Sequence, residues 1–519
     1  MVLAAHSLDS LDAQQLREFA TGLMATLAER ERVIVRKDQE IHYRDTKIGK
    51  LAHEIAVLRR HQFGRKSEQL NGVQGSLLDE AVAADIATIE LELEQLAARP
   101  KADREPRNTP KRTALPAGFP RIDRHHEPES TRCSCGCQLK RIGEDISEKL
   151  DYTPGLFSVE RHVRGKRVCT DCQTLTQAPV PAHVIDKGLP TTGLLAQVLV
   201  AKYADHMPLY RQEKIFARAG LALSRSTLAQ WVSVCGVQLQ PLVDALREAI
   251  LAHRVLHADE TPVQMLKPGN GKTHRAYLWA YTPGAFEELR AVVYDFAESR
   301  SGEHARAFFG DWRGSLICDD YVAYKRSFTQ GITEAGCMAH ARRKLFDLHE
   351  KNQSPVAQQA LRYIGLLYET ERQVRDLDPE QRREVRQEHA KPVALALHTW
   401  MLSQRQLVPD GSTIAKALDY SLKRWGALTR YLDDGQLAID NNWVENQIRP
   451  VALGRANWLF AGSLRAGQRA AAVMSLIHSA QLNGHDPYAY LKDILTRLPT
   501  HKASRIGELL PHNWHPQTA

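Results

Sequence analysis

Three acidic residues lie in local settings that suit metal-dependent chemistry. Asp259 occurs in His257-Ala-Asp-Glu-Thr-Pro262 and Asp319 in Ile317-Cys-Asp-Asp-Tyr321, each after a short apolar run typical of a strand. Because α/β folds place ligands where strands end, we expect these side chains to face a crevice. Glu445 is expected on a helix. Three converging carboxylates can hold two hard divalent ions, which stabilise the attacking and leaving oxygens of a phosphodiester.

The segment around Glu445 carries amides and cations suited to phosphate. Between residues 446 and 485 there is no acidic residue, and arginines stand at 449, 455, 465 and 469. We predict that Arg449 and Arg455 contact DNA. Arg449 follows Glu445 by four residues on one helix face, so the alternative is an intrahelical ion pair. Pro450 is expected to end this helix and to leave Arg449 facing the crevice. Capping by the Asp440-Asn-Asn segment is compatible with either interpretation.

Five of the eight cysteines cluster in Cys133-Ser-Cys135-Gly-Cys137 and Cys169-Thr-Asp-Cys172. Two short turns with paired thiolates are typical of a zinc ribbon, because Zn²⁺ takes four tetrahedral ligands. The clustering favours a metal site in a reducing cytosol over a disulfide framework. Cys137 is an alternative ligand, His162 is a further candidate, and cysteines that bind nothing are the remaining interpretation. The predicted zinc ligands are Cys133, Cys135, Cys169 and Cys172.

The N-terminal region has the pattern of long helices. Apolar residues recur every seven positions from Leu27 to Ile55, and a second helix carries apolar residues from Val82 to Leu96. The two helices form either an internal hairpin or the zipper of a dimer or higher oligomer. A proline-rich segment follows, with seven basic and two acidic residues over positions 99–121. It predicts an extended basic linker, in which Lys111 and Arg112 contact DNA phosphates.

Residues 206–233 predict two short helices around a turn. The first covers residues 210–219, and the second begins at Ser224 or Ser226 and runs to residue 232. DNA-reading helix-turn-helix motifs have this layout, and so do many structural helix pairs. In the first case Arg225, near the start of the second helix, contacts bases.

From residue 254 the pattern predicts a mixed α/β sheet. The expected order is three strands, a helix, a strand, a connection, another strand and a helix. The strands cover residues 254–257, 274–282, 289–295, 315–318 and 333–338, and the helices cover residues 301–312 and 340–350. Residues 354–432 are expected to be helical with breaks at prolines, and helices resume after residue 440.

Composition limits the classes of protein. The chain has 519 residues, 43% hydrophobic and 25% charged, which suits three or four globular domains. It shows neither a membrane-spanning run nor a signal peptide, so we expect a cytoplasmic protein. The net charge of +8 suits a polyanionic partner.

Several motifs together make the chain resemble the transposases of bacterial IS sixty-six-type insertion sequences. They include Phe63-Gly-Arg-Lys-Ser-Glu68, Gly143-Glu-Asp-Ile-Ser-Glu-Lys-Leu-Asp-Tyr152, His257-Ala-Asp-Glu-Thr-Pro262 and Gly336-Cys-Met-Ala-His-Ala-Arg-Arg-Lys344. Asn442-Trp-Val-Glu-Asn-Gln-Ile-Arg-Pro450, Asn457-Trp-Leu-Phe-Ala-Gly-Ser463 and Asn483-Gly-His-Asp-Pro487 complete the set. The resemblance covers nearly the whole chain.

The resemblance implies an RNase H-like fold whose DDE triad falls on Asp259, Asp319 and Glu445, with two Mg²⁺ or Mn²⁺ ions and one structural Zn²⁺. Cys337-Met-Ala-His340 resembles a C-x-x-H pair found before the glutamate of several DDE families, which makes His340 a candidate neighbour of the site. Asp320 stands where family members commonly have glycine, so Asp320 is an alternative metal ligand to Asp319.

The implied function is a DNA transposase that hydrolyses phosphodiesters at the element's ends and transfers the freed strands to target DNA. Its partners are the terminal inverted repeats, target DNA, further copies of the chain and accessory proteins encoded by the same element. The alternatives are a nuclease of the same fold without strand transfer and a catalytically inactive DNA-binding regulator.

The expected fold class is a multidomain α+β protein. Its expected parts are a helical, coiled-coil region (1–98), a basic linker (99–125), a zinc module (126–182), a helix-turn-helix-like segment (183–250), the first part of the core (251–350), a helical insertion (351–435), the second part of the core (436–470) and a helical C-terminal region (471–519).

Overall fold

The computed structural model describes residues 13–63, 72–96, 119–128, 137–153, 156–185, 188–266 and 273–516, with the single positions 115, 117, 130 and 132. They fall into two compact units. Residues 13–63 and 88–96 belong to the first unit, and residues 72–87 and the described residues from 115 onward belong to the second. In this part of the chain no helix has the length and apolar character needed to cross a membrane.

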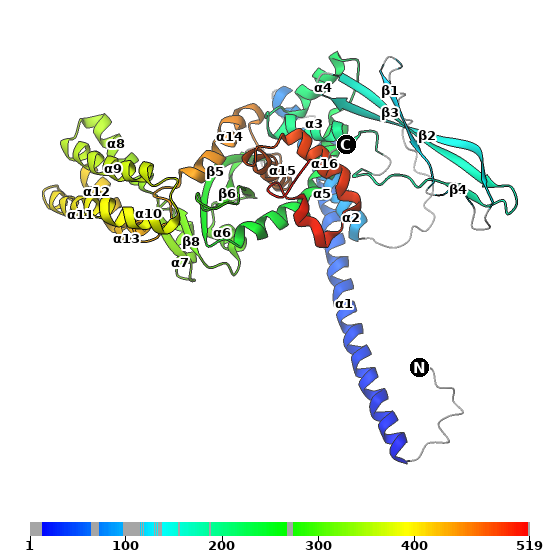
Figure 1. Ribbon diagram of the computed structural model, residues 1–519, viewed down its shortest axis with the longest axis horizontal. Helices are drawn as coiled ribbons and strands as arrows, with labels where there is room; N and C mark the ends of the chain where they lie inside the picture. The colour runs from blue at the N-terminus through cyan, green and yellow to red at the C-terminus, as the bar shows by residue number, and fades with distance from the viewer. Residues whose placement is uncertain are drawn as a thin grey trace. The chain divides into compact units, whose positions relative to one another are not determined.

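The helix α1 (Ala13–Phe63) runs without a break through the first unit (Figure 1). It confirms the long helix predicted from the heptad pattern. Leu27, Ile34 and Ile41 are 54%, 57% and 54% exposed, whereas Leu51 and Leu58 are buried. The first half of the apolar seam therefore lies open to solvent, and its pairing in a coiled coil stays a prediction.

Residues 72–87 of the second predicted helix, α2 (Gly72–Leu96), belong to the second unit and are held within it by two polar contacts. The Ser233 hydroxyl donates a hydrogen bond to the Ala84 carbonyl, and Asp85 forms a buried ion pair with Arg469 at 2.8 Å. Neither the hairpin nor the zipper anticipates this docking. An aspartate on an apolar helix face, such as Asp85, indicates a docking surface only once its buried partner is known.

A four-stranded sheet occupies the predicted zinc module (126–182), and its first strand takes in the last residues of the predicted linker (99–125). Its strands are β1 (Arg121–His126), β2 (Leu139–Thr153), β3 (Leu156–Cys169) and β4 (Leu175–Gln177). β2 and β3 form a long antiparallel ribbon, β1 joins the other edge of β3, and β4 pairs with the last part of β3. The sequence does not reveal this ribbon, because its strands are rich in charged residues, among which lysine and glutamate are depleted in strands generally.

The second sheet has the order β7-β6-β5-β8-β9. β7, β6 and β5 are antiparallel, and β5, β8 and β9 are parallel. The expected mixed sheet and the order of its elements are confirmed. The elements are β5 (Val255–Leu266), β6 (Thr273–Pro283), β7 (Val293–Ala297), α6 (Gly302–Phe309), β8 (Ser315–Cys318), η2 (Val322–Tyr324), α7 (Lys325–Phe328), β9 (Thr333–Gly336) and α8 (Met338–Asn352).

Helices follow the sheet with a hydrophobic cluster of their own, which extends to α8 and to Val255 and Ile317 of the sheet. Pro355, Pro379 and Pro392 lie in the first turns of α9, α10 and α11, where a missing N–H costs nothing. The expected helical segment is thus confirmed, with prolines that begin helices. Its members are α9 (Pro355–Gln373), α10 (Pro379–Val385), the π-helical turn η3 (Arg386–Ala390), α11 (Lys391–Gln406), α12 (Thr413–Lys423), α13 (Trp425–Thr429) and η4 (Arg430–Leu432).

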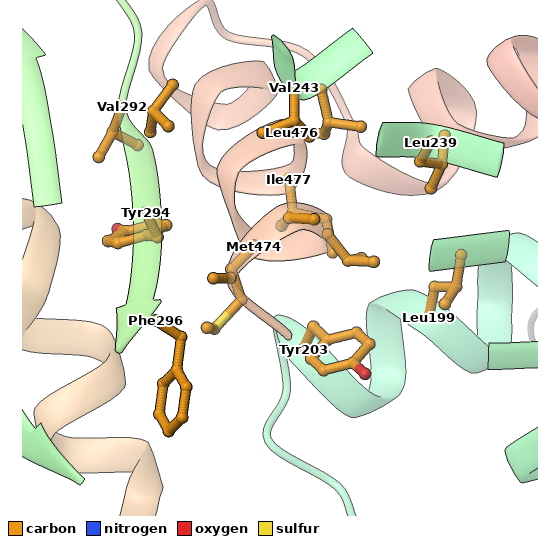
Figure 2. Close-up of a cluster of buried hydrophobic side chains, with 14 of the residues drawn as sticks. Leu199, Tyr203, Leu239, Val243, Val292, Tyr294, Phe296, Met474, Leu476 and Ile477 are labelled. Carbon is orange, nitrogen blue, oxygen red and sulfur yellow. The ribbon is translucent and has the colours of Figure 1, made fainter. Parts of the chain in front are cut away.

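In the main core the second sheet packs against helices that precede it in the chain and helices that follow it. Figure 2 shows Met474, Leu476 and Ile477 of α15 among side chains of β7, α3 and α5. The helices before the sheet are α3 (Thr192–Tyr203), α4 (Leu209–Arg218) and α5 (Arg225–Leu251). Those after it are α14 (Asn442–Trp458), α15 (Leu464–Leu482), α16 (Pro487–Arg497), η5 (Leu498–Thr500) and η6 (Ala503–Leu509).

Candidate active site

Strands β5 and β8 place Asp259 and Asp319 side by side. The two strands are parallel, with His257 opposite Ile317, and each aspartate lies two positions further along. Because side chains alternate and neighbouring strands lie about 4.8 Å apart, both carboxylates belong to the same face. Asp319 directly follows β8, as expected. Asp259, expected at a strand end, lies within β5, which continues beside β6 beyond the point where β8 stops.

Asn441 attaches the start of α14 to β5. Its side chain is fully buried, its Oδ1 lies 2.9 Å from His257 Nδ1, and its Nδ2 donates to the Ala258 carbonyl at 2.9 Å. These two bonds bracket the backbone just before Asp259. They bring the first turn of α14, with Glu445, beside the aspartates. The expected capping role falls to Asp440, whose carboxylate accepts a hydrogen bond from the Asn442 backbone at 3.0 Å.

The Asp259 carboxylate interacts electrostatically with those of Asp319 and Glu445. Burial raises the pKa of Asp259 well above its usual range, and the charges of Glu260, Glu445 and Asp319 raise it further. Among the described residues, no lysine or arginine forms an ion pair with the carboxylates of Asp259, Asp319 or Glu445 within 4.0 Å. Charged carboxylates crowded without a cation are unfavourable, and a bound divalent cation would relieve the repulsion. The donor set is all oxygen, which suits Mg²⁺ or Mn²⁺.

Asp319 and Asp320 have opposite surroundings. Asp320 lies 2.9 Å from Lys325 Nζ and 3.2 Å from Arg424 Nε, so its charge is compensated. The Asp319 carboxylate accepts a hydrogen bond from the Tyr321 backbone at 2.9 Å and interacts with Asp259. This difference favours Asp319 as the third member of the cluster. Nothing in the sequence marks Arg424, which comes from the helical segment 104 positions after Asp320.

Glu260 supports the site from the other face of β5. Its buried carboxylate binds Arg300 and accepts a hydrogen bond from the Tyr324 hydroxyl at 2.9 Å. The Arg300 guanidinium lies 3.5 Å from the centre of the Tyr321 ring, whose hydroxyl donates to the Arg300 carbonyl. The network therefore fixes the loop that carries Asp319. Sequence reasoning missed it, although an acid next to Asp259 on an alternating strand is a signal for a buried partner.

His340 lies beside Glu445, as the sequence predicts for a neighbour of the site. His340 Nδ1 is 3.7 Å from Glu445 Oε1, and Cys337 completes a group whose ligand atoms lie within 4.8 Å of one another. Burial raises the pKa of Cys337 to about 12. The closeness of Cys337 and Glu445, 108 positions apart, was not anticipated.

The arginines after Glu445 have different surroundings. Arg449 is exposed, and no ion pair within 4.0 Å joins it to Glu445, so the structure does not support the intrahelical alternative. Arg455 donates to the Pro262 carbonyl at 2.6 Å and thereby ties α14 to β5. Arg469 is buried against Asp85 and is not available to DNA.

The expectation that Pro450 ends the helix is wrong. α14 continues to Trp458 with Pro450 inside it. Pro450 is on the exposed side, and the helix is held beyond it by the buried Val451 and by the contact of Arg455 with β5. Tertiary contacts here outweigh the cost of proline in a helix. Arg449 therefore lies in the middle of α14.

The described part of the zinc module has a turn at the second cysteine pair. Cys169 ends β3, and Cys172 lies in the turn that follows. In this turn the Gln173 N–H donates to the Cys169 carbonyl, and the Cys169 N–H donates to the Thr174 carbonyl. Cys137 donates to the Asp171 carboxylate at 2.6 Å, so it borders this turn. Cys133 and Cys135 lie outside the described residues.

His162 is not placed to join the cysteine pair. It lies seven positions before Cys169 on β3, which corresponds to about 23 Å. Its Nδ1 is 2.9 Å from His126 Nε2, and the two rings stack. The prediction of His162 as a zinc ligand with Cys169 and Cys172 is therefore wrong. The extended strand β3 keeps His162 and Cys169 far apart, whereas a turn between them would have brought them together.

The predicted helix pair is present as α4 and α5, with Gly220 between them at φ +81° and Ser224 capping α5. However, α5 does not end near residue 232. It continues to Leu251, because its apolar face is a central part of the core. Arg225 lies 3.3 Å from Glu213, so it links the two helices. Lys111 and Arg112 lie outside the described residues.

Comparisons with known proteins agree with these features. The model of the Transposase IS66 family matches residues 187–469, and the IS66 C-terminal element matches residues 475–512. The zinc-finger binding domain of transposase IS66 matches residues 130–173, and the model described as Transposase C of IS166 homeodomain matches residues 50–124.

Three relatives from Sinorhizobium fredii (strain NBRC 101917 / NGR234) match most of the chain. The uncharacterized protein y4jD is 36% identical over 89% of this chain and 94% of its own length. The uncharacterized protein y4qI is 38% identical over 91% of this chain and 90% of its own length. The uncharacterized protein y4hP is 35% identical over 89% of this chain and 88% of its own length. From the family models and the extent of these matches, the chain belongs to the IS66 family of transposases.

Proposed function

We propose that this chain is a DDE-type DNA transposase that cuts phosphodiesters at the ends of its insertion sequence and transfers the freed strands to target DNA. The observation that carries the proposal is the cluster of Asp259 on β5, Asp319 directly after β8 and Glu445 on α14, which has no lysine or arginine ion pair among the described residues. Held by these carboxylates, Mg²⁺ or Mn²⁺ would activate the attacking oxygen and neutralise the leaving oxygen.

The chain's own residues position this cluster. His257 and Asn441 fix Glu445 relative to Asp259 through buried hydrogen bonds. Arg424 and Lys325 hold Asp320 aside. Arg449, exposed one helical turn beyond Glu445, is the residue that would grip a phosphate beside the scissile bond, with two parallel hydrogen bonds from its planar guanidinium.

We assign an RNase H-like core to residues 251–350 and 436–470, interrupted by the helical insertion 351–435. The five-stranded mixed sheet, followed by helices with a cluster of their own before α14, supports this division. We propose the other segments with the limits expected from the sequence, apart from the last residues of the linker, which form β1. A zinc ion held by Cys169, Cys172 and two of the earlier cysteines would stabilise the module around the β2–β3 ribbon.

DNA is the proposed partner, and the element's terminal repeats are the proposed specific sites. The basic linker with Lys111 and Arg112 would supply contacts to phosphates. Arg225, despite its ion pair, stays our candidate for a base contact at the start of α5, because its side chain is 30% exposed. Two or more copies would bring the two ends together through α1.

A strand-transfer assay tests the proposal. The full-length protein is incubated with Mg²⁺, a labelled duplex ending in the element's terminal repeat and a supercoiled target plasmid. A transposase gives label covalently joined to plasmid. Cleavage without joining would instead identify a nuclease, and binding of the repeat without cleavage would identify a regulator.

A further inference from the structure

Cys337, His340 and Glu445 form a group of potential metal ligands that shares Glu445 with the proposed aspartate cluster. Their ligand atoms lie within 4.8 Å of one another. Among the described residues, these three are the group of histidine, cysteine and acidic side chains close enough together to hold one metal ion. His340 Nδ1 and Glu445 Oε1 are buried, 3.7 Å apart, and neither has a hydrogen-bond partner. Buried polar atoms without partners are uncommon, and one ion bound between these two atoms would satisfy both.

The three residues are held at the starts of two helices that are bonded to each other. Cys337 precedes the first turn of α8, which contains His340, and Glu445 lies in the first turn of α14. The Met338 N–H donates to the Ile439 carbonyl at 3.0 Å, and the Asn441 N–H donates to Cys337 Sγ at 3.2 Å. The ligand geometry is therefore largely fixed before any ion binds.

We propose that Cys337, His340 and Glu445 bind a borderline-soft divalent ion of the Zn²⁺ class, with a fourth position open to water. A thiolate, an imidazole and a carboxylate are the ligands that Zn²⁺ takes, at distances of about 2.0–2.3 Å. Tetrahedral geometry at such distances requires ligand atoms roughly 3.5 Å apart, which small side-chain rotations supply here. Mg²⁺ prefers six oxygen ligands and would not favour this site. Binding displaces the thiol proton of Cys337.

The site has a regulatory consequence that rests on the proposed function. Glu445 would belong to both metal sites, since it is also the partner of Asp259 and Asp319. An ion bound to Cys337 and His340 would hold the Glu445 carboxylate close to these two residues. Zn²⁺ would then inhibit Mg²⁺-dependent cleavage by withdrawing one ligand from the hard-metal site.

Binding is measured by equilibrium dialysis of the full-length protein against Zn²⁺, followed by elemental analysis. The variants are Cys337→Ser, which keeps an acceptor for the Asn441 N–H, and His340→Gln. Cys235→Ala is the matched control, because it removes a buried cysteine of α5 outside the group. The cysteines between 133 and 172 contribute equally in all four proteins. We expect the wild type and Cys235→Ala to bind one more ion than the other two, whereas equal numbers in all four would overturn the proposed site.

Inhibition is measured on the same proteins as the Zn²⁺ concentration that halves cleavage in Mg²⁺. Loss of a direct ligand should raise this concentration more than about tenfold in Cys337→Ser, since even indirect supporting residues contribute tenfold or more to affinity. Equal sensitivity of the wild type and Cys337→Ser, with the ion count different, would overturn the shared role of Glu445. Absence of cleavage in every protein, with the ion count different, would refute the proposed function and leave the zinc site standing.

Discussion

His257 shows at the scale of one residue how the site is held. It is fully buried beside Asn441, and burial lowers its pKa to about 4. An unfolded histidine titrates near pH 6.5. As the pH falls from about 6.5 to about 4, the unfolded chain therefore binds a proton that the folded chain does not, and the folded chain loses stability.

We predict that His257→Gln weakens this acid sensitivity. In the wild type the group should cost about 2 kcal/mol of unfolding free energy between pH 7.5 and pH 5, since each pKa unit corresponds to about 1.4 kcal/mol. Urea unfolding at both pH values measures the difference. The same loss of stability in wild type and variant would mean that other groups carry the acid sensitivity.

Arg449 and Arg455 form a natural pair for comparison. Arg449 is exposed on α14, whereas Arg455 donates to the Pro262 carbonyl. We predict that Arg449→Lys lowers the cleavage rate about tenfold or more without changing the melting temperature, because lysine keeps the charge but loses the planar fork. Arg455→Lys should mainly lower the melting temperature. Normal cleavage by Arg449→Lys would assign Arg449 no role at the phosphate.

Among single residues, the sequence identifies the candidate metal-binding acids better than the arginines that position the neighbouring side chains. Asp259, Asp319 and Glu445 stand in recognisable motifs, but Arg424 and Arg300 bind Asp320 and Glu260 across 104 and 40 positions of sequence. These two acids are among the 61 acidic residues of the chain. Such pairs become visible only when the fold brings them together.

At the scale of elements, helices and buried strands follow from the pattern of apolar residues, whereas their ends depend on contacts. β8 covers residues 315–318 as predicted, because it is short, apolar and buried throughout. α5 and α14 both run past their expected ends, since core packing continues them. The β2–β3 ribbon was not predicted, because charged residues line it.

The attachment of α2 to α15 is an element-scale feature that can be measured. Arg469 and Asp85 are both buried, with side chains 6% and 2% exposed. We predict that Arg469→Met lowers the unfolding free energy by about 3–5 kcal/mol, because it leaves Asp85 buried without a partner. The double variant Arg469→Met with Asp85→Leu should recover most of this loss. A double variant that is less stable than Arg469→Met would contradict this account.

At the scale of the whole molecule, α1 offers an exposed apolar seam for assembly. Ile34 and Ile41 are seam positions, and Val35 is equally exposed one residue off the seam. We predict that Ile34→Asp with Ile41→Asp reduces the oligomeric state measured by light scattering, since a charge in a coiled-coil seam is strongly unfavourable. Val35→Asp should leave the oligomeric state unchanged. A monomeric wild type, or dissociation caused by Val35→Asp, would remove α1 from assembly.

The central claim is that the carboxylates of Asp259, Asp319 and Glu445 act as one metal-dependent site and that Asp320 is outside it. The most direct measurement is the rate of Mg²⁺-dependent cleavage of terminal-repeat DNA by Asp259→Asn, Asp319→Asn, Glu445→Gln and Asp320→Asn. We expect the first three to lose about a thousandfold in rate, several kcal/mol of transition-state stabilisation, while they still fold and bind DNA. Asp320→Asn should cleave within about threefold of the wild type, because the Asp320 side chain is 41% exposed and the buried Arg424 keeps its ion pair with Glu334. Cleavage retained in Asp319→Asn and lost in Asp320→Asn would contradict the assignment.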